Sequence, residues 1–231
     1  MSPTEAGARL RYKDLCLDAV DPDVAARFWS RALGLGAEQR GRNVLLGDGV
    51  PEHSVWVNRV PEPQTVKQRV HLDVHAASVE ELLGHGARLL REHPRWTELA
   101  DPEGGELCAF VRPPEELERY RLYELVVDAA DPEQIAGWWA GLFGVEVHHE
   151  EGDDFCWLAD VPGMPWEIVF GSVPEPKRVK NRIHWDLWGD PQVVLAAGAR
   201  LLREPDDDIS WTVLADPEGN EFCVFAPDEW S

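Results

Sequence analysis

Short apolar, β-prone runs along the chain alternate with segments that carry helix-start and helix-end signals. An Asp-Pro pair, which supplies an N-cap and a first helical turn, opens two of these segments, and a glycine suited to a C-cap closes each. Strand-like runs fill most of the rest and are split by an Asp-Pro-Glu-Gly turn. The predicted helices are 23–33, 79–86, 133–143 and 191–198. The predicted strands include 12–19, 44–46, 54–58, 69–75, 123–129, 155–158, 166–170 and 182–188. This pattern predicts four modules in the order βαβββ.

The second half of the sequence repeats the first. Residues 96–110 and 211–225 share eleven of fifteen positions, and Gly-Ala-Arg-Leu-Leu-Arg-Glu occurs unchanged at 86–92 and 198–204. The offset between matching positions drifts only from 110 to 115. A duplicated unit of about 110 residues has the size of a small domain. The predicted domains are 10–113 and 120–227, with the charged, proline-bearing linker 114–119 between them.

Charge narrows the classes of partner. Among 231 residues, 43 are Asp or Glu and only 22 are Lys or Arg, giving a net charge of −21. Such a field repels phosphate backbones and anionic lipids, so we expect neither nucleic-acid nor membrane binding. No apolar stretch reaches transmembrane or signal-peptide length, which predicts a cytoplasmic protein. The cysteines lack Cys-x-x-Cys spacing and are expected to be free thiols: Cys16, Cys108, Cys156 and Cys223.

Two repeated motifs carry a family resemblance. Val-Lys-x-Arg-[Val/Ile]-His-x-Asp occurs at 66–73 and 179–186, and Trp-Thr-x-Leu-Ala-Asp-Pro-Glu-Gly at 96–104 and 211–219. With the module order, they resemble the vicinal oxygen chelate superfamily of glyoxalase I, bleomycin-resistance proteins and extradiol dioxygenases, and especially the glyoxalase-like domains common in actinobacteria. The resemblance implies an α+β fold of two tandem glyoxalase-like domains, each a pair of βαβββ modules forming a curled mixed-sheet cup.

The resemblance also implies where a metal would bind. Enzymes of the superfamily hold one divalent ion with side chains from the first and last strands of paired modules. Carried over by distance from the shared caps and turns, the set in the second domain is Glu124, His184, Cys223, and Glu167 or Val169. The weaker set in the first domain is Asp14, His71, Cys108, and Ser54 or Trp56. Cysteine stands where the family usually has a carboxylate. The implied ion is iron, zinc, nickel or manganese. Buried histidines without a metal, and cysteines packed in the core, are the alternatives.

Tryptophan is unusually frequent, with 11 residues, and several occur only in the second repeat. Aromatic walls suit a planar or cationic small molecule, and the negative charge of the protein favours a cation. Asp186 and Trp188 share one strand face with His184, whereas Trp185 points to the other face. The candidate ligand-binding residues are Asp186, Trp188, Trp157, Trp166 and Trp185. A tryptophan-rich packed core is the alternative.

Three functions are therefore compatible with the sequence. The favoured one is binding of a small, aromatic or cationic metabolite in the cup of the second domain, of the sequestration or resistance type. The alternative is a metal-dependent lyase, isomerase or dioxygenase that uses Glu124, His184 and a third ligand. A scaffold with closed cups is the third. The expected partner is a small molecule, and a homodimer stays open as the state of assembly.

Overall fold

A computed structural model describes residues 9–150, 152 and 154–226, which form two eight-stranded sheets and four α-helices arranged as four modules. The first module contains β1 (Leu10–Ala19), α1 (Pro22–Leu33), β2 (Gly36–Arg40), β3 (Asn43–Gly47), a 3-10 turn (Pro51–His53) and β4 (Val55–Arg59). The second contains β5 (Val70–Ala76), α2 (Val79–Gly84), β6 (Arg88–Glu92), β7 (Thr97–Ala100), β8 (Glu106–Val111) and a 3-10 turn (Pro114–Glu116). The third contains β9 (Leu122–Ala129), α3 (Pro132–Phe143), β10 (Val147–His148), β11 (Phe155–Leu158) and β12 (Glu167–Ser172). The fourth contains β13 (Ile183–Gly189), α4 (Pro191–Ala196), β14 (Arg200–Arg203), β15 (Thr212–Ala215) and β16 (Glu221–Phe225). The predicted fold class is confirmed.

The helix signals in the sequence act as predicted. The Asp21 carboxylate accepts hydrogen bonds from two backbone N–H groups of the first turn of α1, and Asp131 accepts one from the first turn of α3. Gly34 and Gly144 end these helices at φ 71°, a left-handed conformation that favours glycine. No helix in the described part of the chain is long and apolar enough to span a membrane.

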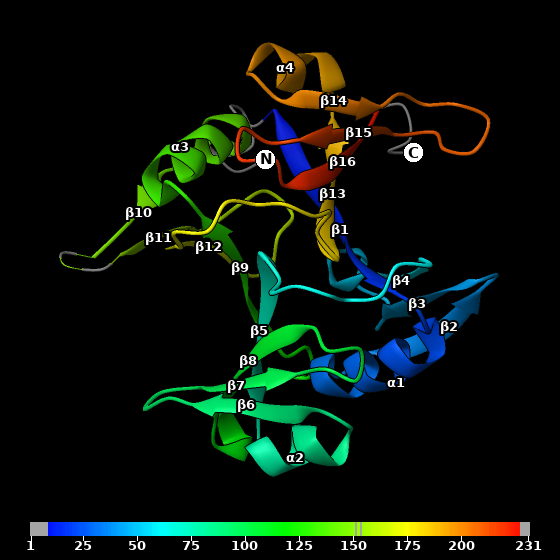
Figure 1. Ribbon diagram of the computed structural model, residues 1–231, viewed down its shortest axis with the longest axis vertical. Helices are drawn as coiled ribbons and strands as arrows, with labels where there is room; N and C mark the ends of the chain where they lie inside the picture. Colours follow the sequence, from blue (N-terminus) through cyan, green and yellow to red (C-terminus); the bar gives the residue numbers. More distant parts are fainter. Residues whose placement is uncertain (1–8, 151, 153, 227–231) are drawn as a thin grey trace.

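Each sheet combines one module from each repeat. Sheet A has the strand order β14-β15-β16-β13-β1-β4-β3-β2 and therefore joins the first module to the fourth. Sheet B has the order β10-β11-β12-β9-β5-β8-β7-β6 and joins the second module to the third. Figure 1 shows this directly, because the blue N-terminal strands run beside the yellow to red C-terminal ones. The repeats seen in the sequence are therefore not the units that share a sheet.

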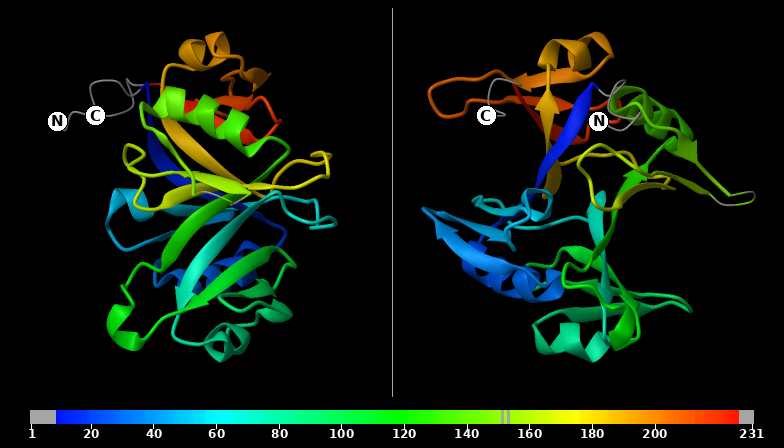
Figure 2. Two further views of the ribbon diagram at one scale, coloured as in Figure 1. Left: turned by 90° about the vertical axis from the view of Figure 1, so that its left-hand side faces the viewer. Right: turned by 180° about the vertical axis from the view of Figure 1, so that it is seen from behind.

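The linker explains this pairing. In sheet B, β8 and β9 lie on the two sides of β5, so residues 112–121 need only carry the chain past one strand. A short linker thereby places the second and third modules side by side, as sequential elements usually are. The first and fourth modules then pair through β1 and β13, which run antiparallel. Figure 2 shows α2 and α4 at opposite ends of the molecule.

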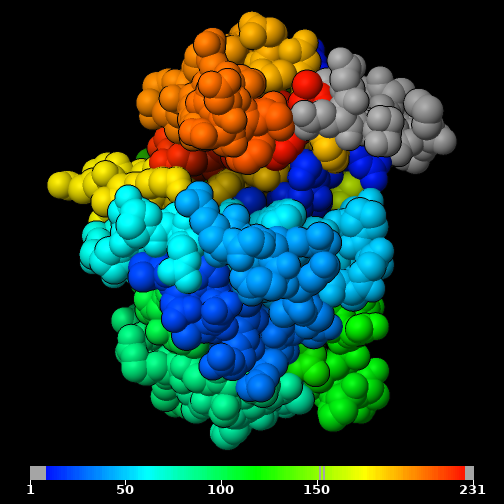
Figure 3. All heavy atoms as spheres, turned by 90° about the vertical axis from the view of Figure 1, so that its right-hand side faces the viewer, coloured from blue at the N-terminus to red at the C-terminus, as the bar shows by residue number. Residues whose placement is uncertain are grey.

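Modules of the same repeat meet through their helices and turns. Trp29 of α1 donates its indole N–H to Asp101 in the second module (3.0 Å), and Trp139 of α3 donates to Asp216 in the fourth (3.3 Å). In Figure 3 the first module, in blue, lies between the fourth, in orange, and the second, in green. The four modules thus form a closed ring, with helix contacts inside each repeat and shared sheets between repeats.

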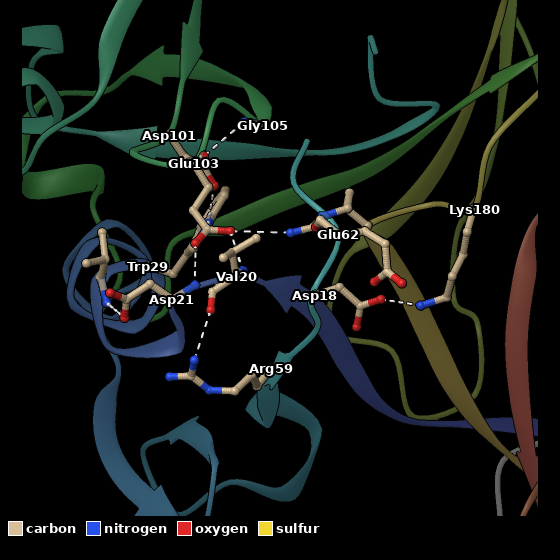
Figure 4. Close-up of polar contacts among 12 residues, drawn as sticks. Asp18, Val20, Asp21, Trp29, Arg59, Glu62, Asp101, Glu103, Gly105 and Lys180 are labelled. Atoms are coloured by element: carbon tan, nitrogen blue, oxygen red, sulfur yellow. Dashed lines mark hydrogen bonds and ion pairs between the residues drawn. The ribbon is translucent and has the colours of Figure 1, made fainter. Parts of the chain in front are cut away.

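Glu103 strengthens one junction of this ring. Its carboxylate accepts hydrogen bonds from the backbone N–H groups of Val20 (2.8 Å) and Asp21 (2.6 Å), at the start of α1 (Figure 4). The same carboxylate lies 3.3 Å from a guanidinium nitrogen of Arg182, just before β13. One side chain of the second module therefore holds both the first and the fourth.

Candidate functional site

We call the side of each sheet opposite its fully buried leucines and isoleucines the cup face. On sheet B, four neighbouring strands place one row of ligand-type residues across this face. Glu167 lies beside Glu124, Glu124 beside Asp73, and Asp73 beside Cys108 in the strand register. His71 precedes Asp73 by two residues and therefore shares the same face. The row draws on both sequence repeats.

The row is compact. His71 Nε2 lies 3.3 Å from Asp73 Oδ1, and ligand atoms of His71, Asp73 and Cys108 all lie within 4.8 Å of one another. A register shift between β5 and β9 adds Tyr123 to the cup face next to Glu124. Its phenol is close enough to the Glu124 carboxyl group to oppose the rise in the pKa of that group. Three carboxylates, an imidazole and a thiol thus share one half-buried site.

Burial and mutual repulsion control the protonation of this site. Burial, followed by the charge of Asp73, raises the pKa of Glu124 to about 7. Burial alone would lower the pKa of His71, but the hydrogen bond and charge of Asp73 outweigh it and raise this pKa overall. Burial and Asp73 also raise the pKa of the Cys108 thiol. Within the described ranges, no lysine or arginine forms an ion pair with Asp73, Glu124 or Glu167. The row therefore holds three carboxyl groups, with the His71 imidazole as the basic group paired to one of them.

The equivalent row on sheet A differs at two positions, because Lys13 stands in place of Tyr123 and Ser54 in place of Glu167. Asp14 lies beside Asp186, and Asp186 beside Cys223, with Cys16 opposite His184. Lys13 lies at a register shift, and its Nζ is 2.6 Å from Asp14 Oδ2. The same ammonium lies 5.2 Å and 4.3 Å from the ring centroids of Trp188 and Phe225. Sheet A therefore neutralises one of its own carboxylates.

The structure groups the predicted metal ligands differently from the prediction, because each sheet combines members of both sets. Glu124 and Glu167 do lie together, but with His71 and Cys108 of the first repeat. His184 and Cys223 lie on sheet A with Asp14, so the structure does not bring Glu124 to His184. The physical reason is that each sheet pairs modules from different repeats. The alternative positions Trp56 and Val169 flank Cys16 and Val126, one row away from the carboxylates.

The predicted tryptophan wall is only partly assembled. Trp185 is fully buried against Trp139, and Trp166 is buried against Tyr12, so neither lines a cup. Trp157 lies on the cup face of sheet B, stacked on His148. Trp188 lies with Asp186 on the cup face of sheet A, against Phe225. The predicted aromatic residues therefore divide between the two cups and the core.

Sequence reasoning missed Cys16, Lys13 and Tyr123. Cys16 follows Asp14 by two residues, so strand alternation alone could have placed it on the cup face. Lys13 and Tyr123 occupy register shifts that reverse this alternation, and no sequence signal marks them.

Comparisons with known proteins agree with the geometry. A family model described as a glyoxalase-like domain matches residues 14–110 and again 124–225. A search of curated proteins found no match. The structure of glyoxalase I from Zea mays is 13% identical with a TM-score of 0.68, the alignment covering 96% of this chain and 94% of that one. A putative dioxygenase from Bacillus subtilis is 12% identical with a TM-score of 0.64, covering 95% and 86%. At these identities the likeness shows the fold, and the resemblance inferred from the motifs is confirmed.

Proposed function

The chain belongs to the glyoxalase-like domain family, and from this premise we propose that the cup face of sheet B holds one divalent metal ion and acts on a small molecule through neighbouring oxygen atoms. The proposed reaction class is a lyase, isomerase or dioxygenase of the vicinal oxygen chelate type. The single observation that carries this proposal is the row of Glu167, Glu124 and Asp73 across adjacent strands, with His71 beside it.

The donor set suits such an ion. Carboxylates and imidazole are the ligands of iron, manganese, nickel and zinc sites, and two carboxylates with a histidine leave coordination positions open for substrate. Burial and then the negative charge of Asp73 raise the pKa of Glu124, and a divalent cation would offset that charge. His71, Glu124 and Glu167 would hold the ion, with Asp73 positioned to orient His71 from 3.3 Å. When bound, the ion supplies a Lewis acid that polarises a carbonyl or enediolate oxygen.

The side chains around the row have their own roles. The Tyr123 phenol, next to Glu124 on the cup face, would orient its carboxylate. Trp157 and Val126 present apolar surface next to the row, which suits the carbon skeleton of a small substrate. His75 stacks on Tyr123 with ring centroids 4.4 Å apart and limits the size of the cup at the other side. These residues would bind and orient the substrate while excluding part of the solvent.

Metal-free binding of a metabolite is the competing function. In the cup lined by Asp186 and Trp188, the ammonium of Lys13 already lies over the aromatic rings. A cationic ligand would have to displace this side chain. Binding of a cationic metabolite on sheet A is therefore less well supported than binding of a metal ion on sheet B.

The test compares metal binding by wild-type protein and two sheet B variants. Protein stripped with chelator is titrated with Mn²⁺ and analysed for bound metal. We expect about one tightly held ion, and at least roughly tenfold weaker binding after Glu124→Gln or Glu167→Ser, because each removes a charged ligand. Glu167→Ser installs the residue that sheet A has at the matching position, Ser54.

The matched control is Asp14→Asn, which changes the corresponding carboxylate of sheet A and should leave Mn²⁺ affinity unchanged. Turnover is then sought with a panel of α-hydroxyketones, α-ketoaldehydes and catechols. Mn²⁺ binding that survives both sheet B substitutions would exclude the proposed site. Binding of a panel compound to metal-free protein, detected by tryptophan quenching and insensitive to chelator, would favour sequestration instead.

A further inference from the structure

Sheet A carries a second cluster of ligand-type side chains with a different chemistry. Cys16 on β1 lies opposite His184 on β13, and Asp186 shares the cup face with both. Cys16 Sγ lies 3.6 Å from Asp186 Oδ2, and His184 Nε2 lies 3.8 Å from Asp186 Oδ1. One ligand atom from each of the three residues lies within 4.8 Å of the other two. Ligand atoms held at 2.0–2.3 Å by one tetrahedral ion lie roughly 3.3–3.8 Å apart, so the spacing is close to that of a metal site.

Asp186 forms no ion pair of its own with a lysine or arginine among the described residues, and the ammonium of Lys13 acts on it only from the neighbouring pair with Asp14. The acidic neighbours of Asp186 on this face each pair with a lysine: Asp14 with Lys13 at 2.6 Å, Glu221 with Lys177 at 2.7 Å, and Asp18 with Lys180. Asp186 itself is only 5% exposed.

Two buried atoms of the cluster also lack hydrogen-bond partners. Asp186 Oδ1 accepts no hydrogen bond, and His184 Nδ1 is buried without a partner. Buried polar atoms normally have hydrogen-bond partners, because burying one without a partner costs its hydration and returns nothing. The weak hydrogen bond from Cys16 Sγ to Asp186 Oδ2 leaves these two atoms unsatisfied.

We propose that Cys16, His184 and Asp186 form a second metal site on sheet A, selective for a thiophilic divalent ion such as zinc. A thiolate and an imidazole favour zinc over harder ions, whereas the three carboxylates of sheet B favour iron or manganese. A thiolate and a carboxylate balance the two charges of the ion, and the Lys13–Asp14 pair adds no net charge. The site goes beyond the function proposed for sheet B and does not depend on it.

Binding must displace two protons. Burial raises the pKa of the Cys16 thiol, and burial with the charge of Asp14 raises the pKa of Asp186, so the metal-free site holds neutral S–H and carboxyl groups. The ion exchanges these protons for a metal–sulfur and a metal–oxygen bond, and both protons are released to solvent. The competing interpretation is a purely structural thiol that packs as a small apolar group and donates weakly to Asp186.

Cobalt distinguishes these interpretations, because a cysteine thiolate bound to Co²⁺ produces a near-ultraviolet charge-transfer band. The titration uses full-length protein carrying Glu167→Ser, so that sheet B is weakened, and a parent without this change. We expect the band in both proteins. Cys16→Ser should abolish it. Cys108→Ser, the matched change in the cysteine of sheet B, should leave it intact. A band that survives Cys16→Ser, disappears with Cys108→Ser, or never forms would overturn the proposal.

A second variant guards against misfolding of Cys16→Ser. His184→Gln keeps an uncharged polar side chain and should weaken Zn²⁺ binding at least tenfold in competition with a chromogenic chelator. Its Mn²⁺ binding on sheet B should match wild type, which separates failure of this site from failure of the proposed function. Wild-type Zn²⁺ affinity in His184→Gln would overturn the proposal equally.

Discussion

Lys13 Nζ lies 2.6 Å from Asp14 Oδ2, and the matching pair on the other sheet is Tyr123 with Glu124. Both Lys13 and Tyr123 are extra residues at a register shift, so each adds a side chain to a cup face. On sheet A that side chain is a cation, and on sheet B it is a phenol. Together with Glu167, which stands where sheet A has Ser54, this difference gives sheet B one more carboxyl group and one cation fewer.

Lys13→Met should destabilise the metal-free protein by about 2–4 kcal/mol, because Asp14 is buried and loses its counterion. Urea unfolding at neutral pH in the presence of EDTA measures the change. Arg40→Met is the control, since the Arg40–Glu38 pair is exposed and should contribute under about 1 kcal/mol. Equal, small losses in the two variants would contradict the role given to Lys13.

Glu124 should make the metal-free protein less stable at high pH. Its folded-state pKa, about 7, lies above the ordinary value of a glutamate, so its stabilising effect is complete below about pH 4.5 and is lost as the pH rises through 7. For a half-buried group this loss is roughly 2 kcal/mol. Unfolding of wild type and Glu124→Gln is compared at pH 5 and pH 8.5. The glutamine variant should lose clearly less stability over this interval, and parallel losses would refute the prediction.

Gly34, which ends α1, is expected to tolerate substitution poorly, and Gly41 provides a control. A Cβ atom there would lie 1.8 Å from the backbone oxygen of Arg119, and φ is +71°. Gly34→Ala should therefore cost more than about 3 kcal/mol. Gly41, at φ +63° with open space around it, isolates the conformational part, and Gly41→Ala should cost about 1–2 kcal/mol. Similar melting temperatures for the two variants would show that the linker can move away from α1.

Glu103 and Glu218 form a natural comparison at the two ring junctions. Both carboxylates accept hydrogen bonds from backbone N–H groups just before a long helix. Among the described residues, only Glu103 also forms an ion pair with a guanidinium, that of Arg182. Glu103→Gln should thus lose about 1 kcal/mol more than Glu218→Gln, since a charge-assisted contact is added to the shared ones. Thermal unfolding of both variants at low and high salt checks this, and the difference should shrink with salt.

Local structure was predictable because local signals specify it. Asp21 and Gly34 mark the ends of α1 by chemistry that needs no partner, and the structure confirms both. The alternation His184-x-Asp186 also predicts correctly that both residues share a face. These features depend on residues only a few positions apart.

The pairing of modules was not predictable from the repeats. His71 and His184 occupy equivalent positions, so the sequence alone does not indicate which of them Glu124 joins. The answer depends on how the linker carries the chain past β5. Lys13 was missed for a different reason. A bulge moves its side chain to the other face of the sheet, and the pattern of apolar and polar residues in the sequence does not reveal the bulge.

The crossing of modules between sheets makes the two halves of the chain obligate complements. The first half, folded alone, would expose the free edges of β1 and β5, and the second half those of β9 and β13, along which the two halves now pair. A break within residues 112–121 would leave both cups intact only while the severed halves stayed associated. The linker then acts as a tether that fixes their effective concentration. Two copies of one half could pair these strand edges in the same way. A duplicated chain and a symmetric dimer of single units are therefore equivalent ways to cover them.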